Sequence, residues 1–199
     1  MIFGSALPVA EAYARLLAGP GARRGLIGPA EAPRLWDRHL LNSAVVAEFV
    51  PDGCVLADIG SGAGLPGVVL AILRPRTHVV LIEPMARRTV FLLEVAGQLG
   101  LENVEVRRGR AEDLAGQIRA DVVTARAVAS LDRLAVLASG VARPGGVVLA
   151  IKGRGATSEV DRARTVLREL GASEVQLVKA GAGLLSEPAT VVRFRTARR

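Results

Sequence analysis

The chain has 199 residues, of which 50% are hydrophobic and only 3% are aromatic, and it carries a net charge of +7. This length suits one domain with a sizeable core and excludes two ordinary enzyme domains. Because Cys54 is the only cysteine, the composition also excludes a disulfide and a cysteine-ligated metal site.

The excess of 26 basic over 19 acidic residues favours a polyanionic partner such as nucleic acid. A GC-rich genome also produces an arginine-rich and alanine-rich composition, so both explanations stay open. The longest uncharged stretch, Ile59–Leu73, contains several glycines and Pro66, which argues against a membrane span. No basic segment precedes a long apolar stretch near the N-terminus, so we expect no signal peptide and a cytoplasmic protein. A monomer without a metal ion is expected.

The first 50 residues are predicted to form an N-terminal helical region. One helix is expected at Val9–Ala18 and another at Ala32–Phe49. Four residues of the second helix have helical spacing and are expected to face the core: Trp36, Leu40, Ala44 and Ala47. Residues 51–199 are predicted to form the cofactor-binding core, and the whole chain is expected to be one compact domain.

From about Gly53 onward, short runs rich in β-branched residues alternate with helical stretches, which predicts an α/β domain with a mainly parallel sheet. Crossover helices are expected at Arg87–Leu99 and Ser130–Ala142. Seven strands are predicted, at Val55–Ile59, His78–Ile82, Val104–Arg107, Ala120–Thr124, Val147–Ile151, Ser173–Val178 and Thr190–Arg195.

The last two predicted strands are joined only by residues 179–189, which contain Gly181, Gly183 and Pro188 but show no helical period. A hairpin at one sheet edge is therefore expected, so that six strands are parallel and the last is reversed. This mixture is typical of a Rossmann-like methyltransferase sheet, whereas dinucleotide-dependent dehydrogenases usually have an all-parallel sheet.

A glycine-rich loop directly follows the first predicted strand, in the sequence Asp58-Ile59-Gly60-Ser61-Gly62-Ala63-Gly64. Its glycines permit positive φ angles and let a ligand touch the backbone. Pro66-Gly67-Val68 then opens the next helix, whose first N–H groups can bind the polar end of a ligand. Because the window Gly62-x-Gly64-x-x-Gly67 also fits the dinucleotide fingerprint, the loop alone does not distinguish S-adenosylmethionine from a dinucleotide.

Acidic residues beyond this loop narrow the choice of cofactor. Asp58 is expected to organise the loop or to receive the ammonium of a methionine moiety, at a position where dinucleotide fingerprints require no acid. Glu83 ends the next strand and is expected to accept both hydroxyls of a ribose, a role that serves either cofactor. Ala111 and Glu112, with Asp113, follow the third strand, where a backbone amide and a carboxylate can recognise adenine, although Asp113 also suits a helix cap.

Methyl transfer from a sulfonium is an in-line displacement, which chiefly needs an aligned nucleophile and the exclusion of water. The chain has no Asp/Asn-Pro-Pro-Tyr cluster for an exocyclic amine and no second cysteine to attack a pyrimidine ring. Guanine N7 has a free lone pair and needs neither device, and an arginine can recognise the neighbouring O6. Arg126 ends the fourth strand, at the edge where doubly wound sheets bind ligands, and is predicted to orient the substrate.

Three further basic residues are candidates for contact with RNA. Arg38 and His39 lie on the second predicted helix, where His39 and Ser43 share a face. This group, which also includes Asn42, is compatible with capping the cofactor or contacting the substrate, and equally with a structural polar cluster. Lys152 ends the fifth strand, where a lysine can contact phosphate or simply be solvated.

These segments resemble the 16S ribosomal RNA guanine-N7 methyltransferases, which form the small-subunit methyltransferase G family, also called the glucose-inhibited division protein B family. The likeness covers nearly the whole chain. The segments that carry it are Leu35–Ser43, Asp58–Gly67, Arg110-Ala111-Glu112, Arg126-Ala127 and Leu149–Gly153. The resemblance implies a Rossmann-like enzyme that uses S-adenosylmethionine to methylate one guanine in the decoding-region loop of 16S rRNA, in the 30S subunit or a late precursor.

By matching position, the resemblance implies five contacts with the cofactor: Gly60, Leu65, Ala111, Glu112 and Arg126. Arg126 is thus expected to touch both ligands. The sequence departs from the family pattern at Ala125, where a serine is expected before the arginine. One hydroxyl near the site is therefore missing, although Thr124 is adjacent.

Three alternatives stay open at this point. A methyltransferase for small molecules needs an enclosing lid or a large insertion, and the sequence shows none. A nucleotide-binding or NAD-using protein is suggested by the window Gly62-x-Gly64-x-x-Gly67. A non-catalytic ribosome-assembly factor that keeps the cofactor fold is the third alternative.

Overall fold

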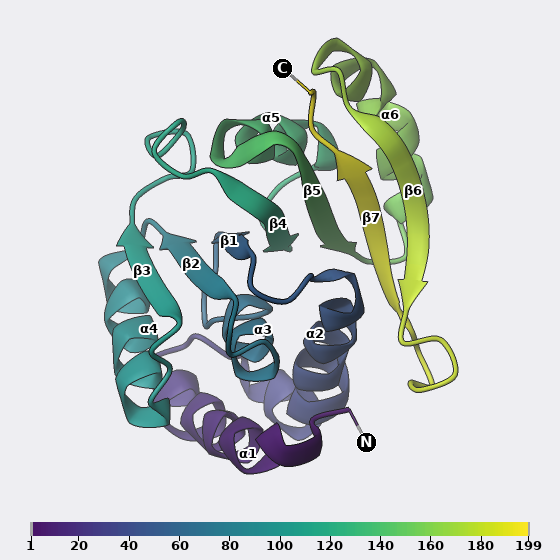
Figure 1. Cartoon of the computed structure of the whole chain (residues 1–199). Coiled ribbons are helices and arrows are strands. Elements are labelled where there is room, and N and C mark those ends of the chain that lie inside the picture. The colour runs from purple at the N-terminus through teal and green to yellow at the C-terminus, as the bar shows by residue number, and fades with distance from the viewer. Residues whose placement is uncertain (1, 199) are drawn as a thin grey trace.

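A seven-stranded sheet forms the centre of the computed structural model, which describes residues 2–198 apart from the side chains at positions 29 and 32. The strands are β1 (Val55–Ile59), β2 (His78–Glu83), β3 (Val104–Arg108), β4 (Ala120–Arg126), β5 (Ala142–Lys152), β6 (Ser173–Ala180) and β7 (Ala189–Arg195). Their spatial order is β3-β2-β1-β4-β5-β7-β6 (Figure 1).

Six strands run in one direction and β7 is reversed. β1 is parallel to β2 and β4, and the pairs β2–β3 and β4–β5 are also parallel. β7 pairs antiparallel with both β5 and β6. The seven predicted strands and the reversed last strand are therefore confirmed. The hairpin lies at one edge of the sheet, with β7 on its inner side and β6 as the edge strand.

Strand β5 begins five residues earlier than the sequence pattern predicts. It includes Arg143-Pro144-Gly145-Gly146, a composition that indicates a turn when it is considered alone. The register between β4 and β5 shifts between Ala120 and Val122. This irregular pairing tolerates a proline, which has no N–H to donate to a ladder.

Helices cover both faces of the sheet, because successive strand residues point to opposite faces. Val79 and Leu81 of β2 belong to the core beneath α3 (Gly67–Leu73) and α4 (Ala86–Leu99). Val80 and Ile82 belong to the core beneath α5 (Leu131–Val141) and α6 (Ala156–Glu169) (Figure 1). Both predicted crossover helices are confirmed to within one residue at each end.

The N-terminal residues form a series of short helical segments. The first group consists of η1 (Gly4–Ala6), α1 (Leu7–Leu16) and η2 (Leu17–Gly21). The second group, predicted as one helix, consists of η3 (Pro29–Arg34), η4 (Leu35–Leu41), α2 (Asn42–Ala44) and η5 (Val45–Phe49). The prediction of one regular helix is therefore wrong, and Pro33 inside η3 gives one reason, because it cannot donate to an α-helical ladder.

The N-terminal segments share one apolar core with the sheet. Leu40, Ala44 and Ala47 are buried as predicted, in the cluster that also holds Leu56 of β1. Trp36 is half-buried and meets Phe3 edge-on, with 5.9 Å between ring centroids. Because one cluster spans both parts, the division at residue 50 stays a prediction.

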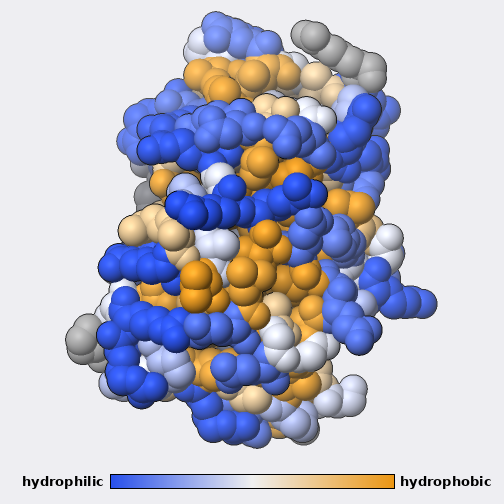
Figure 2. All heavy atoms as spheres, turned by 90° about the vertical axis from the view of Figure 1, so that its left-hand side faces the viewer, coloured by the Kyte–Doolittle hydropathy of each residue, from blue (hydrophilic) through white to orange (hydrophobic). Residues whose placement is uncertain are grey.

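The side of the molecule formed by β3 and α4 shows apolar surface between bands of hydrophilic side chains (Figure 2). On α4, Val90 and Leu93 are more than half exposed. Within residues 2–198, no helix is long and apolar enough to cross a membrane.

Candidate functional site

The glycine loop leaves β1 at the carboxyl end of the strand. Gly60, Gly62 and Gly64 have positive φ angles of 65°, 58° and 100°, as their residue type permits. The N–H groups of Gly60 and Ser61 donate to the carbonyl of Ile82 in β2, at 2.9 and 3.1 Å. A Cβ atom at Gly64 would lie 2.7 Å from the Tyr13 hydroxyl, so this position has no room for a side chain.

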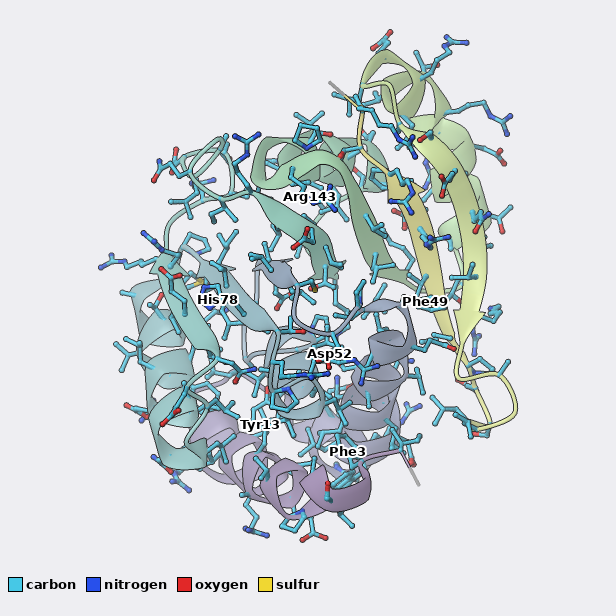
Figure 3. The ribbon with its side chains drawn as sticks, viewed as in Figure 1. Phe3, Tyr13, Phe49, Asp52, His78 and Arg143 are labelled. Carbon is cyan, nitrogen blue, oxygen red and sulfur yellow. The ribbon has the colours of Figure 1, made fainter. Side chains whose placement is uncertain are left out.

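Tyr13 supports the loop from helix α1, on which it is labelled in Figure 3. The side chain is fully buried, and its hydroxyl donates to the carbonyl of Ala63 at 2.7 Å. Burial raises the pKa of this hydroxyl, which therefore stays protonated. The sequence analysis missed this residue because a lone tyrosine 50 positions before its partner gives no local signal.

Asp58 is fully buried at the end of β1. Its Oδ2 accepts a hydrogen bond from the N–H of Gly67 at 3.2 Å, and its Oδ1 accepts one from the Thr124 hydroxyl at 3.0 Å. Burial raises the pKa of Asp58 to about 6. These contacts tie β1 to β4 and to the start of α3, which supports the first of its two predicted roles, the organisation of the loop. The next amide of α3, at Val68, donates to the carbonyl of Gly64, so the first two amides of α3 are already paired.

Glu83 ends β2 with only 1% of its surface exposed. Its Oε2 accepts from the N–H of Gly62 and its Oε1 from the N–H of Met85, both at 2.9 Å. Arg88 Nη1 lies 3.7 Å from Oε2. Because each carboxylate oxygen can accept more than one hydrogen bond, this fixed carboxylate keeps acceptor capacity for a ligand.

A pocket of about 340 Å³ opens beside Glu83, at the carboxyl ends of β1, β2 and β4. This volume lies in the range that is typical of small-ligand sites. Four of the predicted cofactor residues line the pocket: Gly60, Glu83, Ala111 and Glu112. The lining also includes residues that the sequence analysis did not predict, among them Met85, Arg88, Val128 and Arg133. Val128 packs closely against the glycine loop, because a Cβ atom at Gly60 would lie 2.7 Å from one of its methyl groups, so Gly60 has no room for a side chain.

The other predicted cofactor residues lie outside the lining of this pocket, and their contacts stay predictions: Asp58, Gly62, Gly64, Leu65 and Arg126. Leu65 is buried in the apolar core that the loop covers. Gly62 is adjacent to the pocket through its bond to Glu83.

Arg126 belongs to a polar cluster with His39, Glu31 and Arg38. Its Nη2 donates to His39 Nδ1 at 2.8 Å, and its Nη1 donates to the carbonyl of Arg38 at 3.4 Å. Glu31 Oε2 lies 2.7 Å from His39 Nε2, and Glu31 Oε1 lies 3.1 Å from Arg38 Nη1. The structure thus brings together three predicted substrate residues at the end of β4, through Glu31, which the sequence analysis missed.

The ionisation states of the side chains in this cluster depend on their burial and on the charged groups beside them. Burial, and then the Arg126 guanidinium, lower the pKa of His39. The hydrogen bond from His39 lowers the pKa of Glu31. At neutral pH the cluster therefore holds a carboxylate, a neutral imidazole and two guanidinium groups. Ser43, one turn after His39, is fully buried, and its hydroxyl has no partner among the described residues.

Lys152 is committed to two partners within the protein. Its Nζ donates to the carbonyl of Ala129 at 2.8 Å and to Glu159 Oε2 at 2.7 Å, and its side chain is only 7% exposed. These bonds join the segment after β4 to α6. The RNA contact predicted for Lys152 stays a prediction, and it requires at least one of these bonds to open.

Comparison with known proteins identifies the family. Residues 7–187 match the family model described as rRNA small subunit methyltransferase G. A relative of that name from Thermobifida fusca is 53% identical over 192 residues, which are 96% of this chain and 81% of the relative. This chain belongs to the ribosomal RNA small subunit methyltransferase G family. Another member, from Mycobacterium leprae (strain TN), is 54% identical over 198 residues, which are 98% of this chain and 80% of the relative. The resemblance that the sequence motifs indicated is confirmed.

Solved structures show that the methyltransferase G chain has a methyltransferase fold. A SAM-dependent methyltransferase from Aquifex aeolicus matches with a TM-score of 0.61 at 19% identity, over 86% of this chain and all of that one. A SAM-dependent O-methyltransferase from Thermotoga maritima matches with a TM-score of 0.60 at 16% identity, over 80% of this chain and 66% of that one. The predicted Rossmann-like methyltransferase architecture is therefore confirmed.

Position 125, where this methyltransferase G chain departs from the expected pattern, is an almost fully buried alanine in β4. The neighbouring Thr124 does not replace the missing hydroxyl beside the pocket, because its own hydroxyl donates to Asp58. No group of three or more potential His, Cys, Asp or Glu metal ligands occurs in the part of the chain that the structure describes.

Proposed function

We propose that this methyltransferase G chain transfers a methyl group from S-adenosylmethionine to N7 of a guanine in the decoding-region loop of 16S rRNA, on the 30S subunit or a late precursor. The observation that carries the proposal is the pocket beside the glycine loop, where the buried Glu83 carboxylate is held at the carboxyl end of β2. This pocket lies in a chain that is more than half identical to proteins named for methylation of small-subunit rRNA.

The residues around the pocket fit S-adenosylmethionine. Glu83 provides carboxylate oxygens for ribose hydroxyls, and Ala111 and Glu112 line the same pocket from the segment after β3, where adenine is expected. With ribose and adenine assigned to these residues, the methionine end of the cofactor is expected to bind at the glycine loop around Gly60. The alternative cofactor, NAD, is less well supported because β7 is antiparallel, whereas dinucleotide-binding sheets are usually all parallel.

The chain itself has a limited chemical task in this reaction. Bound S-adenosylmethionine supplies an activated methyl group on a sulfonium. The protein has to align the acceptor with that methyl group and exclude water. Arg126, at the end of β4, is a cation that can donate to guanine O6 and so hold N7 in line. Guanine N7 needs no general base, because its lone pair is free.

The distribution of charge supports an RNA substrate. The chain carries a net charge of +7, and Arg34, Arg38 and Arg154 are exposed in segments near the carboxyl ends of β4 and β5. Phosphate contacts by such arginines release counterions, so binding to the particle is expected to weaken steeply as salt concentration rises. A small-molecule acceptor would show no such dependence.

Two measurements test the proposal. Calorimetric titration with S-adenosylmethionine and with NAD compares the cofactors, and stronger binding of NAD contradicts the assignment. Transfer of a labelled methyl group to 30S particles that lack the modification tests the substrate, with 50S particles and naked 16S rRNA as comparisons. Labelling confined to 16S rRNA supports the proposal, whereas cofactor binding without any labelling of 16S rRNA refutes the substrate assignment and favours a non-catalytic assembly factor. Sedimentation of the purified chain tests the expected monomer.

A further inference from the structure

The imidazole of His39 bridges an acid and a base on different elements. Glu31 of η3 lies 2.7 Å from Nε2, and Arg126 at the end of β4 lies 2.8 Å from Nδ1. His39 itself is on η4, and its side chain is only 13% exposed. The ring therefore connects two residues that are 95 positions apart in the chain.

The partners of this ring determine where its proton is. A guanidinium group has only donors, so Nδ1 of His39 has to act as an acceptor toward Arg126. The single proton of the neutral ring then lies on Nε2, from which it is donated to the Glu31 carboxylate. With the other tautomer, Nδ1–H would face a guanidinium N–H, and the bond between His39 and Arg126 would be lost.

We propose that Glu31 is a positioning residue, whose carboxylate fixes His39 in the Nε2–H tautomer so that Nδ1 holds the Arg126 guanidinium at the end of β4. This inference rests on the proposed function, in which Arg126 orients the guanine. Arg126 directly precedes residues 127–129, which line the pocket, and in the proposed reaction its guanidinium orients the acceptor there. A displacement of about 1 Å at such a position can reduce the rate roughly a hundredfold.

The surroundings of His39 define how the cluster responds to acid. Glu31 favours the protonated ring, whereas Arg38, Arg126 and burial disfavour it. Arg34 acts on Glu31, and Tyr13 and Asp58 act on Arg126. Protonation of His39 places N–H groups on both sides of the ring and breaks the bond to Arg126. Activity is therefore expected to fall as pH decreases through the pKa of His39, which lies below its ordinary value.

Nitrogen NMR of the imidazoles tests the tautomer without RNA or cofactor. The chain has two histidines, so a His78→Gln variant assigns the signals of His39. The expected wild-type spectrum has an unprotonated Nδ1 and a protonated Nε2. In the Glu31→Gln variant the neutral amide is a weaker acceptor for Nε2–H, so the ring is expected to turn away from Arg126 in part of the molecules and to show a mixture of tautomers. A wild-type Nδ1 that carries the proton, or a Glu31→Gln spectrum identical to wild type, overturns the proposal.

Steady-state methylation tests the consequence for Arg126. The Glu31→Gln variant is expected to lose roughly ten- to hundredfold in kcat, with little change in the KM for the particle. The fall of activity on the acidic side of the variant's pH profile should also move to lower pH, because removal of the carboxylate lowers the pKa of His39 further. The control Glu94→Gln, on α4, removes the ion-pair partner of another arginine, Arg24, and is expected to match wild type in kcat and in pH profile.

A double-mutant cycle separates positioning from a general structural role. The His39→Asn variant keeps an acceptor near the position of Nδ1 but ends the link to Glu31, so adding Glu31→Gln to it is expected to change kcat no further. An additive loss in the double variant, or a Glu31→Gln enzyme with wild-type kcat and pH profile, refutes the positioning role. If the tautomer is as expected but the wild-type protein methylates no 16S guanine, the proposed function fails and the tautomer assignment stands.

Discussion

The Asp58→Asn variant is expected to be more stable than wild type at pH 8, despite lying next to the glycine loop. Asp58 is fully buried, and burial raises its pKa from 3.8 to about 6. At about 1.4 kcal/mol for each pKa unit, the ionised carboxylate costs the fold at most roughly 3 kcal/mol at pH 8. An asparagine avoids this cost and keeps both contacts, by accepting from Gly67 and donating to Thr124.

The pH dependence of this effect has a defined sign. Between pH 4 and pH 6 the folded protein binds a proton at Asp58 more readily than the unfolded chain does, so this group contributes less stability as pH rises. The difference between variant and wild type is therefore expected to be largest above pH 6 and to shrink toward pH 4. Urea denaturation of both proteins at several pH values measures it.

The Asp121→Asn variant is the matched control. Burial alone would raise the pKa of Asp121, but the Val55 N–H and the Arg143 guanidinium hold it below its ordinary value. This variant is therefore expected to be less stable than wild type at pH 8, with a difference that disappears as pH falls through the pKa of Asp121. An Asp58→Asn variant that is no more stable at pH 8, or whose advantage does not shrink with acid, refutes this account of Asp58.

Cofactor binding by the same variant distinguishes the two roles that the sequence leaves open for Asp58. Because Gly67 and Thr124 occupy its carboxylate, the variant is expected to bind S-adenosylmethionine nearly as well as wild type. Direct capture of the ammonium by Asp58 would instead cost roughly tenfold or more in affinity.

Three further substitutions test the site. Glu83→Gln places an amide donor opposite the N–H of Gly62 or Met85. Calorimetry should therefore show that the affinity for S-adenosylmethionine falls by roughly tenfold or more. Unchanged affinity would show that Glu83 does not bind the cofactor. Tyr13→Phe removes the hydrogen bond to the Ala63 carbonyl and is expected to cost about 1 kcal/mol of stability. Because the glycine loop loses this support, the affinity for the cofactor is also expected to fall. A variant with wild-type stability but weaker cofactor binding would contradict this link between loop stability and affinity. Gly67→Ala puts a Cβ atom 2.7 Å from Asp58 Oδ2 and is expected to lower the free energy of unfolding by roughly 1–3 kcal/mol. Gly97→Ala, on α4 with open space around it, should instead raise the free energy of unfolding by up to about 1 kcal/mol. Equal thermal midpoints for the two variants would refute the packing argument.

The sequence predicts the sheet well because local patterns determine it. Apart from Asp58, the run Val55–Ile59 is β-branched or apolar, as suits a strand buried on both faces, and the observed strand has the predicted bounds. The glycine loop can be predicted equally well from the sequence, because positive φ angles at Gly60, Gly62 and Gly64 favour glycine. Strand β5 was predicted too short, because Pro144 indicates a turn locally while pairing with β4 extends the strand beyond it.

The parts of the site that the sequence does not predict depend on tertiary contacts. Glu31 carries no motif, and only the packing of η3 against η4 places its carboxylate at His39. Tyr13 similarly needs α1 to pack beneath the loop before its hydroxyl reaches Ala63. Lys152 has the residue type of a phosphate ligand, yet Glu159 on α6 pairs with it in the folded chain. Periodicity shows which face of an element is buried, but it does not show which polar groups meet across elements.

The most direct test of the proposed reaction is chemical cleavage at 7-methylguanosine in 16S rRNA, after incubation of the protein with 30S particles that lack the modification. We predict one new cleavage site, in the decoding-region loop, that requires S-adenosylmethionine and is lost with the Glu83→Gln protein. Methyl transfer to another atom, or bound cofactor with no cleavage at any 16S guanine, would contradict the account.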